Sequence, residues 1–121
     1  MSADPSPTLQ AVVTALQTVF PSSVYAQIAP DQTAAPFAVY TRVATTPEVT
    51  VASGIPIRNM RLQLDVYAPT YAQAVLLASQ AETALTSVAY PISVVPLSQA
   101  DSFEPDVRLH RVISEYSVWH F

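Results

Sequence analysis

The stretch that decides the fold is residues 59–67, NMRLQLDVY, in which apolar and polar side chains alternate. A period of two is typical of a strand that has one buried face and one face in water, as is common in antiparallel sheets. We therefore predict that its apolar set faces a core covered by helices: Met60, Leu62, Leu64, Val66. The polar set, which includes Arg61, Gln63 and Asp65, is predicted to face away.

A helix is predicted directly after this strand. Pro69 ends the strand, and Thr70 is placed to cap a helix over residues 71–88. Its apolar positions form one stripe: Ala74, Leu77, Ala78, Ala81, Leu85, Val88. Leu76 lies outside that stripe among polar side chains. A partly covered surface leucine is the favoured interpretation, and an anchor in a protein interface is the alternative.

The segments before residue 59 predict a helix, two strands and a long loop. Thr8 is placed to cap a helix with apolar positions from Leu9 to Phe20, while residues 1–7 are expected to be flexible. Residues 22–30 form a weak strand candidate. Residues 36–43 form a better one, with Phe37, Val39 and Val43 on one face. Residues 44–56 have no clean period and contain the single glycine, Gly54, so we interpret them as a long hairpin loop.

The C-terminal part predicts two more strands. Residues 90–99 are interrupted by Pro96, which indicates an edge strand or a bulge. Residues 100–106 are interpreted as a loop, and residues 107–121 as a closing strand. The predicted fold is α+β, with one antiparallel sheet of four to five strands and two helices packed on one face. A parallel strand at one edge, which would make the sheet mixed, is an open alternative. A length of 121 residues predicts a single domain over 1–121.

Composition argues against several classes of function. The chain has no cysteine, which excludes disulfides and thiolate chemistry, and a single glycine does not suffice for a phosphate-binding loop. Nine acidic residues against five arginines give a net charge of −4, which is too negative for a protein that grips nucleic acid. The N-terminus does not resemble a signal peptide, and no apolar run is long enough to span a membrane. We expect a soluble protein made in the cytoplasm.

No set of residues predicts a catalytic, cofactor-binding or metal site. His110 and His120 share one strand, but at roughly 3.3 Å per residue they are about 33 Å apart and cannot share a metal ion. Asp101, Glu104 and Asp106 lack the spacing and the glycine of a calcium loop, so a solvated turn is favoured. We expect a protein that is not an enzyme.

Two further groups of residues are candidates for contacts. Arg61 and Asp65 lie on the same face of one predicted strand, and Arg111 and Glu115 lie on the same face of the last one. If the two strands are neighbours, a structural charge ladder on a solvent-facing sheet surface is favoured over a ligand site, each pair contributing well under about 1 kcal/mol. Apolar residues also gather in the loop, beside Glu48, and at the end of the chain: Val49, Val51, Ile55, Trp119, Phe121. For these residues, contact with a protein partner is favoured over packing against the surface of the same chain.

The order of these segments resembles the tail-completion or tail-terminator proteins of long-tailed bacteriophages, a family also found in prophages and phage-derived particles. The resembling stretches cover about residues 24–121: VYAQIAP, APFAVYTRV with TPE, RLQLDVYAPTYAQA and HRVISEYSVWHF. The strand ending QLDVYA that runs into a TYAQA helix is the most telling of them.

The resemblance implies an α+β subunit that forms a ring, commonly a hexamer, at the head-proximal end of the tail tube. There it would stop tube growth and contact both the tube protein and the neck, or connector, of the capsid. DNA would pass through the ring without specific binding. The family has no catalytic residues to carry over, and its place is the tail–neck junction of a virion. Two alternatives stay open: another neck component, such as a head-closure or adaptor protein, and a small ferredoxin-like ligand-binding or regulatory domain.

Overall fold

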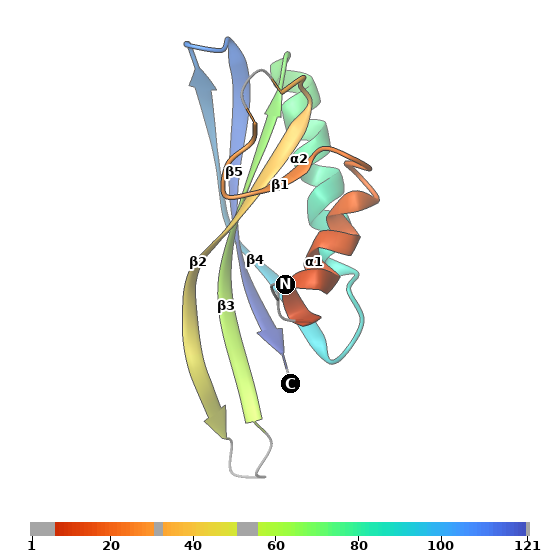
Figure 1. Cartoon of the computed structure of the whole chain (residues 1–121), viewed down its shortest axis with the longest axis vertical. Helices are drawn as coiled ribbons and strands as arrows, with labels where there is room; N and C mark the ends of the chain where they lie inside the picture. The colour runs from red at the N-terminus through yellow and green to blue at the C-terminus, as the bar shows by residue number, and fades with distance from the viewer. Residues whose placement is uncertain (1–6, 31–32, 51–55, 121) are drawn as a thin grey trace.

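The computed structural model describes residues 7–30, 33–50 and 56–120, and in it both helices cover one face of a five-stranded sheet (Figure 1). The elements follow in the order α1 (Pro7–Gln17), β1 (Val24–Ala26), β2 (Phe37–Thr50), β3 (Pro56–Ala68), α2 (Tyr71–Thr86), β4 (Ile92–Glu104) and β5 (Leu109–His120). The strands lie in the order β1-β2-β3-β5-β4. β1 runs parallel to β2 and all other neighbours are antiparallel, so the predicted α+β class is confirmed and the sheet has a mixed edge.

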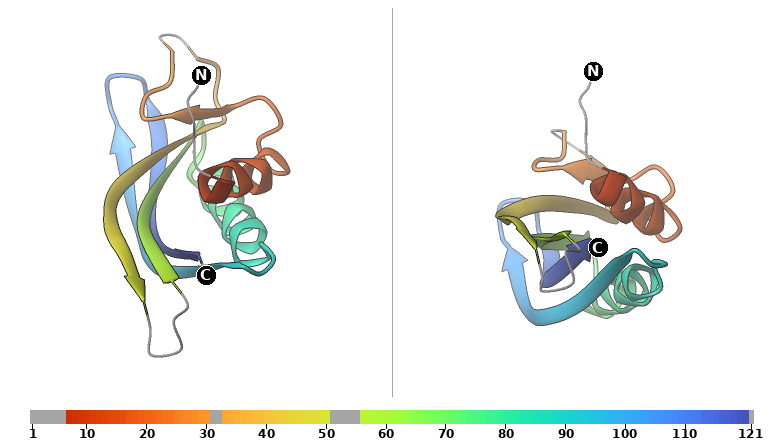
Figure 2. Two further views of the ribbon diagram at one scale, coloured as in Figure 1. Left: turned by 60° about the horizontal axis from the view of Figure 1, so that its bottom comes forward. Right: turned by 90° about the horizontal axis from the view of Figure 1, so that it is seen from below.

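The core lies between the helices and the sheet, as the alternation in residues 59–67 predicted. Leu62, Leu64 and Val66 of β3 have no exposed surface, and Met60 is buried. They pack with the buried positions of the other elements: Val12, Leu16, Ala38, Ala74, Ala78, Ala81, Leu85, Val112, Tyr116, Val118. Small alanines on the buried stripe of α2 allow this helix to lie close to the strands. The two views of Figure 2 show that the opposite face, here called the outer face, carries no helix.

The start of α2 follows the local sequence signals. The Thr70 side chain accepts a hydrogen bond of 3.2 Å from the backbone N–H of Gln73, as an N-cap residue does. Both helices end earlier than the apolar pattern indicated, α1 at Gln17 and α2 at Thr86. In α1 the last predicted turn is irregular, although Phe20 still packs into the core.

The described residues of two predicted loops are mostly in strands. In the segment 44–56, β2 continues to Thr50 and β3 begins at Pro56, and these two residues are paired across the hairpin. Pro47 is tolerated because the register shifts between Thr46 and Val49, so no regular ladder bond is required there. Val51 and Ile55 lie outside the described residues. We call this two-stranded extension, residues 45–50 and 56–60, the hairpin arm.

The segment 100–106 is also mostly strand, because β4 runs on to Glu104 along β5. Polar composition suggested a loop, but pairing with a distant strand overrides that local preference. β4 is an edge strand, and its register shifts between Pro96 and Ser98, in agreement with the predicted effect of Pro96. Among the described residues, no helix has the length and apolar character needed to cross a membrane.

Candidate functional site

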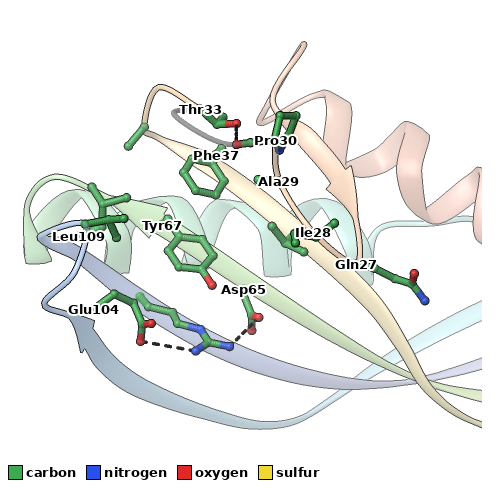
Figure 3. Close-up of a pocket in the computed structure, with 14 residues that line it drawn as sticks. Gln27, Ile28, Ala29, Pro30, Thr33, Phe37, Asp65, Tyr67, Glu104 and Leu109 are labelled. Atoms are coloured by element: carbon green, nitrogen blue, oxygen red, sulfur yellow. Dashed lines mark hydrogen bonds and ion pairs between the residues drawn. The ribbon is translucent and has the colours of Figure 1, made fainter.

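An open pocket of about 680 Å³ lies on the outer face, at the end of the sheet where β2 begins and β3 ends (Figure 3). Its floor comes from Phe37 and Val39 of β2 and from Tyr67 of β3. The segment after β1, which includes Ile28 and Pro30, lines one side. Glu104, Val107 and Leu109, around the β4–β5 turn, line the other. We call this the outer pocket.

Aromatic rings form the apolar part of the outer pocket. Phe37 and Tyr67 are cross-strand partners, and their rings stack with centroids 4.8 Å apart and planes 18° apart. Tyr25 of β1 meets Phe37 edge to face, with centroids 6.3 Å apart. Such stacked and edge-to-face geometries are those in which aromatic quadrupoles attract one another. This end of the outer face is therefore a second, smaller packed cluster.

Arg111 of β5 forms the polar part of the pocket. Its Nη2 donates to Asp65 Oδ2 at 2.9 Å, and its Nη1 lies 3.5 Å from Glu104 Oε2. The guanidinium carbon lies 5.6 Å from the centre of the Tyr67 ring, in a cation–π position. Gln63 Nε2 donates to the same carboxylate of Asp65, at 3.1 and 3.3 Å. Asp65 thus accepts hydrogen bonds from two side chains, which compensates for its burial.

The burial of this cluster changes the acid–base behaviour of its groups. Burial raises the pKa of Tyr67; the Arg111 charge opposes this rise, and the Asp65 and Glu104 charges add to it. Burial lowers the pKa of Arg111, but the hydrogen bond and charge of Asp65, with Tyr67 and Glu104, raise it further than burial lowers it. The guanidinium therefore stays charged, and two carboxylates surround one cation.

Asp65 corrects the prediction of a fully solvent-facing outer surface. It lies on the predicted face, opposite the core, but it is only 5% exposed, and Arg111 is half-buried. The reason is the cover that the outer pocket residues provide at this end of the sheet. Arg61 is exposed and Glu115 half-exposed, so further along the strands the face is open to solvent as predicted.

The predicted charge ladder forms for one of its two pairs. β3 and β5 are antiparallel neighbours, and Arg111 binds Asp65 across them. Both pairs lie on diagonals of the ladder, since Asp65 is opposite Ile113 and Arg61 is opposite Ser117. In the described part of the chain no ion pair joins Arg61 to Glu115. The two histidines lie at opposite ends of β5, and the ring of His110 sits near Tyr71 and Phe103, with centroids 5.9 and 5.0 Å away.

The acidic residues of the expected loop are held by other side chains. Asp101 accepts a 2.6 Å hydrogen bond from the Tyr71 hydroxyl, which raises the pKa of Tyr71. Glu104 lies against Arg111. Over the described residues, no group of three His, Cys, Asp or Glu side chains is arranged to hold a metal ion.

The predicted interface residues are distributed over the molecule. Leu76 is 56% exposed on α2, and Trp119 is 38% exposed near the end of β5. Glu48 and Val49 lie in the hairpin arm, while Val51, Ile55 and Phe121 fall outside the described residues. Further exposed apolar side chains occur on β4, at Val95, Leu97 and Phe103.

The outer pocket itself was missed in the sequence. One signal was present: in residues 37–40 apolar side chains occupy every position, not every second one, which indicates a strand covered on both faces. Phe37 and Val39 face the outer pocket, whereas Ala38 belongs to the core. Val43 does not share their face as predicted, because the register shifts between Arg42 and Ala44 and leaves it exposed.

Comparison with solved structures finds a chain with a similar fold. A chain from the virion of a native gene transfer agent particle superposes with a TM-score of 0.59, at 13% sequence identity, over 93% of this chain and 90% of that one. At that identity the likeness shows a shared α+β fold.

Comparison of the sequence with protein families identifies the family of this chain. The family described as Tail completion protein gp17 matches residues 6–120, so the chain belongs to that family. It is therefore a structural protein of a bacteriophage-type tail, and the resemblance found in the sequence is confirmed. Comparison with curated proteins finds no match.

Proposed function

We propose that this protein caps the head-proximal end of the tail tube as a ring, ends tube growth and joins the tail to the head. The family match over residues 6–120 is the observation that carries the proposal, because tail completion is the step for which the family is named. The chain acts as one domain and performs no catalysis. Its place is the tail–neck junction of the virion, after assembly in the host cytoplasm.

A closed ring follows from what the protein must cap. A terminator that covers every subunit of a tube end has to share the rotational symmetry of the tube, and we expect a hexamer. The partners of the ring are then further copies of this chain, the last ring of tube protein and a connector protein of the neck. DNA crosses the ring without specific contacts, in keeping with a chain of net charge −4.

Exposed apolar side chains support protein contacts on several sides of the subunit. Leu76 on α2 and Trp119 on β5 are exposed, and Glu48 and Val49 belong to a third place in the fold, the hairpin arm. We assign them, with Val51, Ile55 and Phe121, to interfaces with copies, tube or neck. Arg61 and Glu115, on the open part of the outer face, remain solvent-facing in this arrangement.

Gene deletion tests the proposal. Particles assembled without this protein should have tails of irregular length that do not join heads, and the wild-type gene supplied in trans should restore both properties. Trp119→Ser and Leu76→Ser should restore them poorly. Val107→Ser changes an exposed apolar side chain of the outer pocket, to which no interface is assigned, and should restore them fully. Uniform, head-joined tails in the deletion strain, seen by electron microscopy, would contradict the proposal.

A further inference from the structure

One edge of the sheet is long and exposes apolar side chains. β4 is the last strand, and within the described chain it has β5 as its only strand neighbour. Pro96 and the register shift beside it occupy the first half, so residues 98–104 form a free edge without proline. Val95, Leu97 and Phe103 are exposed along β4. Soluble proteins usually protect such an edge with charges, proline or a covering segment.

The other edge of the sheet is also incomplete. β1 pairs with β2 only at residues Ala38 to Tyr40. Beyond that point β2 continues to Thr50 with β3 on one side and no strand among the described residues on the other (Figure 1). A free strand segment, residues 41–50, thus lies at the opposite edge from β4.

We propose that β4 of one copy pairs with the free segment of β2 in the next copy, so that one sheet continues from subunit to subunit around the ring. This inference rests on the proposed function. It names residues 98–104 and 41–50 as the two sides of a single interface. Backbone hydrogen bonds supply the contact, in the manner by which an added strand extends an exposed edge.

The directions of the strands favour a second copy as the occupant. Three antiparallel steps, β2 to β3, β3 to β5 and β5 to β4, make β2 and β4 run in opposite directions. Through β5 and β3 the registers place Ser98 level with Thr41, with residues 98–104 and 41–50 extending to opposite sides of that level, so the ring axis must be inclined to the strands. A rotation about such an inclined axis offsets the two edges along their length and keeps their opposite directions, so they meet as an antiparallel pair. Because the two edges are different surfaces, the contact is head to tail and can close into a ring.

Charge also favours this pairing. The free edge of β4 carries Asp101 and Glu104 and no basic residue. The β2–β3 hairpin on the other side carries Arg42 and Arg58, with Glu48 as its one acidic residue between 41 and 61. Arg42 is exposed. An acidic edge that meets a basic one fixes the orientation of neighbours and disfavours β4–β4 pairing.

Engineered cysteines test the inference without background, because the chain has no cysteine of its own. Ala100→Cys and Ser102→Cys place a thiol on β4, and Thr41→Cys and Ala44→Cys place one on the free segment of β2. All four positions pair with outer-face residues of a neighbouring strand, so they share one face of the continued sheet. Val107→Cys, in the exposed β4–β5 turn, is the matched control.

One β4 variant and one β2 variant are co-expressed in cells that assemble tails, and the purified tails are oxidised and analysed on denaturing gels. We expect disulfide-linked dimers for at least one β4–β2 combination. Each variant alone, and Val107→Cys with either β2 variant, should stay monomeric on the gel. A disulfide requires Cα atoms about 4.4 to 6.8 Å apart, so only true neighbours react.

Other outcomes overturn the inference. Dimers from a β4 variant alone indicate β4–β4 pairing. The absence of dimers in all four combinations, in tails that contain the protein, shows that the ring is joined elsewhere while leaving the proposed function intact. Tails that lack the protein altogether overturn the proposed function and this inference together.

Discussion

Leu64 lies at the centre of β3 with no exposed surface, packed between the sheet and the helices. Leu64→Ala should lower the free energy of unfolding by about 2 to 5 kcal/mol, because it removes buried apolar groups and leaves a cavity. Leu76→Ala removes the same atoms from a side chain that is 56% exposed, and should change stability by less than about 0.5 kcal/mol. Urea unfolding followed by circular dichroism measures both. Equal losses would contradict the assigned core.

Asp65 depends on its partner across the strands. Asp65→Asn removes the charge that Arg111 binds at 2.9 Å and should lower the free energy of unfolding by about 1.5 to 3 kcal/mol, the range for hydrogen bonds to charged groups. Glu115→Gln is the matched control, because Glu115 is more exposed and makes no ion pair among the described residues. If both variants unfold at the same urea concentration as the wild type, the pair contributes nothing to stability.

Tyr116 should make stability depend on alkaline pH. Tyr116 is fully buried, and its hydroxyl has no hydrogen-bond partner among the described residues. Burial raises the pKa of Tyr116 from 10.0 to about 12, and the nearby Ser114 side chain lowers it by a smaller amount. Between these values the unfolded chain loses the phenolic proton and the folded chain keeps it. The unfolded state then binds fewer protons, so stability falls as pH rises from 10 towards 12.

The fall due to Tyr116 should reach roughly 2 to 3 kcal/mol, since one pKa unit corresponds to about 1.4 kcal/mol. Tyr116→Phe cannot ionise, so its stability should decline less over the same interval, in unfolding curves measured at pH 9, 10, 11 and 12. Ionisation of Tyr67 and Tyr71 changes the stability of both proteins alike, so their contribution cancels in the comparison. Parallel declines in the two proteins would show that Tyr116 does not carry this dependence.

At the scale of single residues, alternation predicted which side chains of β3 face the core but not that Asp65 is buried. The cover over Asp65 comes from distant segments, including residues 27–30 and the β4–β5 turn. Local periodicity reports which face a residue is on, whereas its exposure also depends on what packs over that face.

At the scale of elements, signals within a few residues were sufficient for α2 and for the edge position of β4. Pro69 with Thr70, and Pro96, act on the backbone directly. The hairpin arm was predicted as a loop because residues 44–56 have no clean period and contain Gly54, and the end of β4 because its composition is polar. Their strand structure comes from pairing with residues far along the chain, such as Phe103 with His110, which composition does not report.

The hairpin arm provides a prediction at this scale. Replacing residues 47–58 by Asn-Gly, a two-residue turn suited to a β-hairpin, keeps the pair Thr46 and Asn59 and removes the rest of the arm. The fold should persist in circular dichroism, because the helices and the core residues of β3 remain. Tails complemented with this variant should be irregular in length or fail to join heads, since the arm carries part of the proposed interface.

Electron microscopy of the complemented tails decides the role of the arm. A shortened protein that folds and still gives uniform, head-joined tails would show that the arm is a spacer.

At the scale of the whole molecule, the order of elements was enough to predict an α+β fold and a tail-completion family. The way in which copies meet was not predicted. The proposed contact between copies uses two edges of the sheet. The sequence does not show these edges, because they follow from the pairing of β1 with only three residues of β2 and from the position of β4 as the last strand.

The central claim is that this chain forms the ring between tail tube and neck. Electron cryomicroscopy of purified particles, with the tail–neck junction reconstructed on its own, tests it most directly. We predict a single ring of this fold stacked on the last ring of tube protein, with six copies and with the sheets of neighbouring copies joined at β4 and β2. A junction in which tube protein meets the neck directly, or in which this chain lies elsewhere in the particle, would contradict the claim.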